Sequence, residues 1–311
     1  MFHRIPCLVF LVGLVAVHAP SALAQTNSWV GKKIMPKEGP LDLRMVDANN
    51  QWRVVGTLDN AIVTVEKEDG QRLKVRSHYT SGWIDKKDVV LLDDALDYFN
   101  ERIRHDDKNA TFYNSRAIAW SEKGEYDIAI KNYDEAIRLN PKDAVLVSNR
   151  GNAWAEKRNY DRAINDYDVA IRLDPNYVAA FVNRAIVWNA TKDYEKALKD
   201  CDEAIRLDAK RVPAYACQAW WLATCPDAKF RDGKKAVESA TKACELSEWQ
   251  DPTLLGNLAA AYAEAGEFDN AIKWQKKAFD FPTYERDHKQ TAELGRKLLK
   301  LYEAKMPYRR E

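Results

Sequence analysis

The sequence has almost no net charge, little histidine and no glycine-rich segment. Its 311 residues hold 48 lysines and arginines against 47 acidic residues, and the charges alternate in sign instead of gathering in blocks. Nucleic acids and anionic membranes attract proteins through clustered positive charge, so no nucleic-acid partner is expected. The 12 glycines stand apart from one another, which excludes the glycine-rich loops that hold phosphate groups.

Residue clusters that support catalysis or metal binding are also missing from the sequence. Beyond residue 24 the only histidines are His78, His105 and His288, which are far apart in the chain. No nucleophile motif or metal-ligand spacing accompanies them. The sequence therefore predicts a non-enzymatic protein with no catalytic residue, no metal site and no cofactor.

The longest apolar run is at the N-terminus. Arg4 precedes an apolar segment from Cys7 to Val17, and residues 21–24 (Ser-Ala-Leu-Ala) offer small residues where a signal peptidase cleaves. Residues 1–24 are interpreted as a signal peptide, with an uncleaved membrane anchor as the alternative. Their removal takes away one arginine and no acid, leaving 47 residues of each sign. An exported protein of the periplasm or cell envelope is expected, in contact with a membrane only if this segment is uncleaved.

A sequence repeat of constant length organises the middle of the chain. Seven-residue blocks starting at Asn114, Ser148 and Val182 each hold an arginine, then a small residue, and end in tryptophan. Each block is followed by a second apolar pattern that ends in Ala-Ile-Arg-Leu. Small residues let two helices approach where they cross, and the larger aromatic residues fill the wider space between them. The repeat predicts helical hairpins that must stack on their neighbours to bury their apolar faces.

Less regular units flank these three. The interval between the small residues Ala219 and Ala236 is longer by five than the interval between Ala185 and Ala197, so an insertion is expected in the loop near Pro226. A fifth unit restores the shorter interval. The predicted organisation is a half-repeat helix at 93–109, five hairpins at 110–283, and a capping helix with a tail at 284–311.

Residues 28–92 have a different pattern, with seven short β-rich runs. Val63 and Val65 alternate with polar residues on one side of an Asp-Gly turn, which indicates a β-hairpin. This many short strands in so few residues predicts a small β-barrel. Trp52, Tyr79 and Trp83 are expected in its core, with an aromatic peptide groove as the alternative.

Both regions resemble known families. Residues 110–211 resemble tetratricopeptide repeats, and residues 28–92 resemble bacterial Src-homology-3-like domains. Residues 221–246 resemble a variant common in bacterial tetratricopeptide proteins, which indicates a bacterial origin. The predicted fold is thus an α+β multidomain chain: a small N-terminal β-barrel, then an all-α tetratricopeptide superhelix of about five hairpins.

The tetratricopeptide resemblance implies that the first helix of each hairpin lines a concave groove. Mapping the family's groove positions onto this chain gives Asn114, Ser115, Asn149, Asn152, Asn183, Asn189 and Asn257. Asparagine amides both donate and accept, so a row of them can hold an extended backbone; a simply solvated face is the alternative. The expected partner is a protein or peptide of unknown identity. Attachment to cell-wall material through the barrel is the alternative function.

Chaperone-binding members of that family grip a terminal carboxylate with lysine and arginine. The corresponding positions in the third unit are Ala179 and Asn183, so this activity is not expected here.

Two further sets of residues have predicted structural roles. Aspartates that recur with the hairpin are expected to pair with arginines on neighbouring helices: Asp134, Asp168 and Asp202 with Arg116, Arg150 or Arg184. Four cysteines follow residue 24: Cys201, Cys217, Cys225 and Cys244. They are interpreted as buried thiols, and if one disulfide forms, the pair at the same end of a hairpin is Cys217–Cys244.

Overall fold

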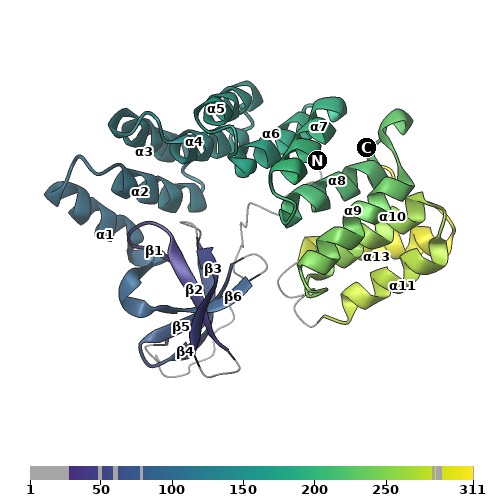
Figure 1. Ribbon diagram of the computed structural model, residues 1–311, viewed down its shortest axis with the longest axis horizontal. Coiled ribbons are helices and arrows are strands. Elements are labelled where there is room, and N and C mark those ends of the chain that lie inside the picture. The colour runs from purple at the N-terminus through teal and green to yellow at the C-terminus, as the bar shows by residue number, and fades with distance from the viewer. Residues whose placement is uncertain are drawn as a thin grey trace. The chain divides into compact units, whose positions relative to one another are not determined.

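The computed structural model describes residues 28–47, 51–58, 62–77, 80–281, 284 and 289–310. The predicted signal peptide and Tyr79 lie outside these residues. Contacts divide the chain into two compact units, and the division falls between Asp166 and Tyr167, within one helix. The units are described separately below, with the element labels of Figure 1.

The first unit begins with an antiparallel sheet. Its strands are β1 (Lys33–Pro36), β2 (Leu41–Val46), β3 (Trp52–Leu58), β4 (Val63–Asp69), β5 (Arg72–Ser77), β6 (Thr80–Asp85) and β7 (Val89–Leu91). They pair in the order β3-β2-β6-β5-β4-β1-β7. The predicted hairpin is β4–β5, which turns at Gly70 with φ 58°. Among the described residues, β3 and β7 are the edge strands of this sheet. The predicted β-rich region is therefore confirmed as a sheet. No pairing between β3 and β7 is seen among these residues, so closure into a barrel is not shown.

The alternating residues of the strands form the core of this sheet. Val63, Val65, Leu73 and Val75 are buried together with residues from the other strands. Trp52 is 42% exposed, and the Arg72 guanidinium lies over its ring at 4.5 Å. The expectation that Trp52 packs in the core is therefore wrong, because it begins the edge strand β3 and its ring is only partly covered. Trp83 is half-buried.

Helices follow the sheet in pairs. In the first unit they are α1 (Leu92–His105), α2 (Ala110–Glu122), α3 (Tyr126–Leu139), α4 (Ala144–Glu156) and the start of α5 (Tyr160–Leu173). The second unit holds the rest of α5, then α6 (Val178–Ala190), α7 (Tyr194–Leu207), α8 (Val212–Thr224), α9 (Gly233–Leu246), α10 (Pro252–Glu264), α11 (Phe268–Phe279) and α13 (Lys289–Glu303). None of the helices that the structure describes is long and apolar enough to cross a bilayer.

Local sequence explains where these helices begin and how they turn. Asn109 and Asp143 precede α2 and α4, and their side-chain oxygens accept from backbone N–H groups of the first turn at 3.0 and 2.9 Å. The turn inside a hairpin requires a positive φ, which Gly124 supplies at 80°. Arg158 and Lys192 occupy the corresponding turns of the next two hairpins at 60° and 67°, a conformation that costs a non-glycine residue free energy.

The helices pack through the small residues of the repeat. Ala117, Ala129 and Ala153 are buried with Tyr133 in the first unit. In the second unit, residues 225–232 separate α8 from α9, whereas residues 191–193 separate α6 from α7. The loop is thus longer by five, as predicted, and it contains the short 3-10 helix Ala228–Phe230.

Candidate functional site

Arginines of the repeat form a series of partly buried polar contacts, called here the polar ladder. The Arg150 guanidinium donates to both oxygens of Asp166 at 2.9 and 2.7 Å and to Asp134 at 2.7 Å. Arg184, one repeat later in the chain, donates to Asp200 at 2.8 and 2.7 Å and to Asp168 at 2.6 Å. The predicted pairing of Asp134 and Asp168 with the repeat arginines is confirmed. In each case one acceptor precedes the arginine in the sequence and the other follows it at the same separation.

Neutral residues take the end positions of the polar ladder. Arg116 donates to Asn132 at 2.7 Å and to Asn100 at 2.8 Å, so it faces two amides instead of two carboxylates. At the other end, glutamine replaces arginine: Gln218 donates to Asp202 at 2.6 Å and accepts from Ser239 at 2.6 Å. Asp202 therefore pairs with Gln218 and Lys235, and its predicted arginine partner is wrong because position 218 is not an arginine.

Burial makes the polar ladder structural. The Asp166 and Asp200 side chains are only 3% and 8% exposed. Hydrogen bonding to Asp166 raises the pKa of the Arg150 guanidinium, whereas burial, opposed by Arg184, raises the pKa of Asp200. The prediction missed these two aspartates, although their recurrence at the repeat interval was a signal in the sequence. Ions this well paired hold neighbouring helices together and offer little to a ligand.

In the first unit, the predicted groove residues divide by exposure. Asn114 and Ser115 on α2 are buried, and Asn114 accepts a hydrogen bond from the Asn149 amide at 3.1 Å. Asn149 and Asn152 on α4 are half-buried. The first helix of the second hairpin therefore presents two amides with exposed surface.

The second unit shows the same division. Asn183 on α6 is half-buried. Asn189 is 4% exposed and accepts from Arg310 at 3.0 Å, and Asn257 is 5% exposed and donates to the Ala216 carbonyl at 3.4 Å. Asn149, Asn152 and Asn183 are thus the predicted residues with the most surface to offer a partner. Sequence periodicity gives the helix face of a residue but not how deeply its neighbours cover it.

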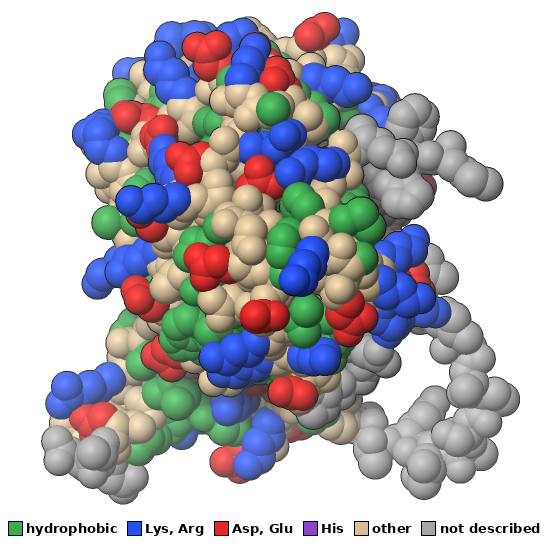
Figure 2. Space-filling model, turned by 90° about the vertical axis from the view of Figure 1, so that its right-hand side faces the viewer, with side chains coloured by type: hydrophobic (Ala, Val, Ile, Leu, Met, Phe, Trp, Pro, Cys, Tyr) green, Lys and Arg blue, Asp and Glu red, His purple; other side chains and the backbone are tan. Residues whose placement is uncertain are grey.

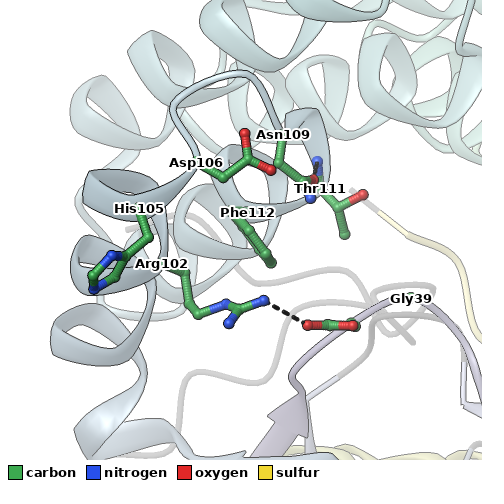
Figure 3. Close-up of a pocket in the computed structure, with 8 residues that line it drawn as sticks. Gly39, Arg102, His105, Asp106, Asn109, Thr111 and Phe112 are labelled. Carbon is green, nitrogen blue, oxygen red and sulfur yellow. Dashed lines mark hydrogen bonds and ion pairs between the residues drawn. The ribbon is translucent and has the colours of Figure 1, made fainter.

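A cavity of about 470 Å³ lies in the first unit near the α1–α2 turn (Figure 3). Its Arg102 guanidinium donates to Glu38 at 2.8 Å and lies over the Phe112 ring at 4.7 Å. Its lining comes from the β1–β2 loop, the end of α1 and the start of α2: Glu38, Gly39, Arg102, His105, Asp106, Asn109, Thr111 and Phe112. No motif predicted it, because its two halves come from different parts of the sequence.

The four cysteines after residue 24 are all buried free thiols in the structure. Burial raises the pKa of the Cys244 thiol to about 12, which disfavours its reactive thiolate. This agrees with their interpretation as small core residues, and no Cys217–Cys244 disulfide is formed. Within the described residues there is also no group of three or more potential metal ligands.

Basic and acidic side chains are interspersed over the surface shown in Figure 2, with apolar side chains between them. No block of one charge dominates this face, as the sequence predicts. A partner for such a surface is recognised through local contacts rather than through a long-range field.

Comparison with known proteins identifies the repeats. Residues 116–178 and 148–212 match a tetratricopeptide repeat model, and residues 253–281 match a second tetratricopeptide repeat model. These segments, less than half of the chain, are therefore tetratricopeptide repeats, as the resemblance implied. No curated protein matches the chain.

Two solved structures with TM-scores above 0.5 show the same helical fold at low identity. Yeast Tom70 is 20% identical, with a TM-score of 0.55 over 67% of this chain and 43% of its own. A chain of the APC/C hetero-tetramer Cut9-Hcn1 is 14% identical, with a TM-score of 0.55 over 68% of this chain and 40% of that chain. YrrB, a TPR protein with an unusual peptide-binding site, is 20% identical, with a TM-score of 0.46 over 64% and 97%. The helices of each unit therefore have the tetratricopeptide-type fold.

Proposed function

We propose that this protein is a non-enzymatic interaction scaffold that holds a peptide or protein partner against the first helices of its repeats. The observation that carries the proposal is a tandem array of tetratricopeptide hairpins whose first helices α4 and α6 bear the half-buried asparagines Asn149, Asn152 and Asn183. In this family the first helices line the groove. Amide side chains there can bond to a partner's backbone without requiring one sequence.

Crosslinking in the native organism, followed by mass spectrometry, identifies the partner, and a pull-down with the purified chain measures its affinity. Asn149→Ala with Asn183→Ala should weaken binding by about thirtyfold, since each of the two lost hydrogen bonds contributes on the order of 1 kcal/mol. Asn165→Ala is the matched control, because Asn165 is exposed on α5, a second helix. Equal affinity of the double variant and the control would refute the groove assignment.

We also propose that residues 1–24 direct export to the periplasm or cell envelope. The support is the apolar segment after Arg4 and the small residues at 22 and 24. Mass spectrometry of the protein from cell fractions tests this. An N-terminus at Gln25 in the envelope fraction is expected, and an uncleaved chain in the cytoplasm would contradict it.

A second candidate function is attachment through the N-terminal sheet, which we propose is a Src-homology-3-like domain. Its edge strand β3 and the adjoining strand β2 expose apolar side chains: Met45, Val46, Trp52, Val54 and Val55. Exposed apolar groups in one place favour an interaction surface. The protein should sediment with purified cell-wall material, and Val54→Lys should reduce this more than Val145→Lys, which alters an exposed valine of α4. A protein that stays in the supernatant is no wall-attachment protein.

A further inference from the structure

The C-terminal residues 306–310 form neither helix nor strand and lie against the rest of the second unit. The backbone N–H of Arg310 donates to the Thr224 carbonyl at 3.1 Å, and its guanidinium donates to the Asn189 side chain at 3.0 Å. Thr224 is the last residue of α8, and Asn189 is the last but one of α6. One tail residue thus joins the ends of two successive first helices.

The preceding arginine reaches the end of a third first helix. Arg309 forms an ion pair at 2.5 Å with Glu264, the last residue of α10. The Glu264 side chain is only 11% exposed and also pairs with Arg231 at 3.1 Å. Its carboxylate is therefore held in a fixed position where a second guanidinium can bind.

An aromatic contact completes the set. The Tyr308 ring lies 6.1 Å from the Trp220 ring, at a tilt of 36°. Trp220 is on α8, and nearly every residue of that helix is buried. The tail residues 308–310 are themselves half-buried. Three consecutive tail residues thus each have a partner on the ends of α6, α8 and α10, a surface called here the rim.

The chemistry of the rim explains why it takes arginine. The last carbonyls of a helix have no partner within the helix and carry partial negative charge. Three helix ends and the Glu264 carboxylate therefore make the rim a site for cations that can donate several hydrogen bonds. Arginine meets this need better than lysine, because its planar guanidinium presents several donors in fixed directions.

We propose that the rim is a binding site for an extended peptide that carries an aromatic residue followed by two arginines, and that the chain's own tail occupies it as an intramolecular competitor. This rests on the proposed scaffold function but uses a surface distinct from Asn149 and Asn183. A partner with this pattern must displace residues 308–310. The apparent affinity for the partner is therefore the intrinsic affinity multiplied by the fraction of molecules in which the tail has left the rim.

The test uses the full chain and a fluorescein-labelled peptide with the sequence of residues 304–311. Fluorescence anisotropy compares the wild-type protein with Arg309→Ala/Arg310→Ala, which empties the rim. The tail variant should bind the peptide at least about tenfold more tightly than wild type. Adding Asn189→Ala or Glu264→Gln to that variant should weaken binding by about tenfold or more. A peptide with both arginines changed to alanine should not bind.

Other results overturn the proposal. A tail variant with an unchanged circular dichroism spectrum that does not bind the peptide means that the tail only caps the fold. Equal binding by wild type and the tail variant also rules out competition. If the double variant does not fold, Arg310→Ala alone serves, because it keeps the Arg309–Glu264 ion pair. The two sites are tested separately. Binding of the native partner to the Asn149→Ala/Asn183→Ala variant tests the proposed scaffold surface, and binding of the tail peptide to the same variant tests the rim. Failure of one proposal is thus distinguished from failure of the other.

Discussion

Replacing Arg184 by glutamine should destabilise the second unit by about 3 to 5 kcal/mol, the range for removing one partner of a buried ion pair. Asp200 is 8% exposed and takes two of its hydrogen bonds from Arg184 at 2.8 and 2.7 Å. Without the guanidinium, the carboxylate stays buried and unpaired. Urea unfolding followed by circular dichroism measures the loss of free energy. Hydrogen exchange of α6 and α7 localises it, because stacked repeats unfold in parts.

The chain supplies its own controls for this prediction. Asp200→Asn recreates the Arg116–Asn132 contact and should cost only about 1 kcal/mol, since a hydrogen bond remains. Arg184→Gln with Asp200→Ser recreates Gln218 with Ser239 and should recover much of the loss, because no buried charge is left. A double variant as unstable as Arg184→Gln alone would refute the reasoning.

The pH dependence of that destabilisation provides a second check. Burial raises the pKa of Asp200 in the folded protein above its unfolded value, so the fold favours the protonated carboxyl. Its contribution to stability is thus greatest below the unfolded pKa and falls as pH rises through the folded pKa. Loss of Arg184 strengthens this effect. The cost of Arg184→Gln should therefore shrink as pH falls from neutral toward the usual range of an aspartate.

Three further predictions concern other parts of the chain. Hydrogen bonds from Lys86 and from the Trp29 backbone lower the pKa of Glu68 from 4.5 to about 2. The ionised Glu68 carboxylate therefore stabilises the fold above the pKa of the unfolded state, and this stabilisation is lost as pH falls toward the pKa of the folded state. In an acid titration followed by tryptophan fluorescence, the folded signal of Glu68→Gln should fall less steeply than that of the wild-type protein. Identical profiles for the two proteins would contradict this prediction. Gly233→Ala should cost about 1 to 3 kcal/mol in urea unfolding, because the new Cβ would lie 2.6 Å from the Ala265 backbone. The control Gly256→Ala, with its nearest neighbour at 3.7 Å, should be neutral or stabilising; equal costs would show that backbone approach is not the cause. The protein lacking residues 1–24 has four thiols, which Ellman's reagent should not modify in the folded state. In urea without reductant all four should react. Fewer than four reactive thiols in urea would reveal a disulfide.

Periodic features of the fold were accessible from the sequence. The constant interval between the tryptophan-ended blocks predicts the helical hairpins, and the longer interval between Ala219 and Ala236 locates the insertion that the structure contains. The Arg150–Asp134 contact follows from the same period, because equivalent residues of stacked repeats meet equivalent neighbours.

Features that depend on non-repeating contacts were not accessible. Asn189 appears in the sequence as one more polar groove residue, but Arg310, from the far end of the chain, accounts for one of its hydrogen bonds. Trp52 appears as a core aromatic residue, and only the strand order shows that it begins an edge strand. No local pattern encodes either fact, because each depends on which distant segments the fold brings together.

The irregular fourth hairpin combines the features that the rim requires. Pro226 follows the end of α8 closely, and the carbonyl of Thr224, the last residue of that helix, accepts from the tail. The longer loop supplies Arg231, which bonds to the carbonyls of Cys225 and Pro226 at 2.9 and 3.1 Å and holds Glu264 for a second arginine. A unit of regular length has no room for this loop. The departure from the repeat therefore lies next to the groups that the tail contacts, and its Arg231 shares the Glu264 carboxylate with Arg309.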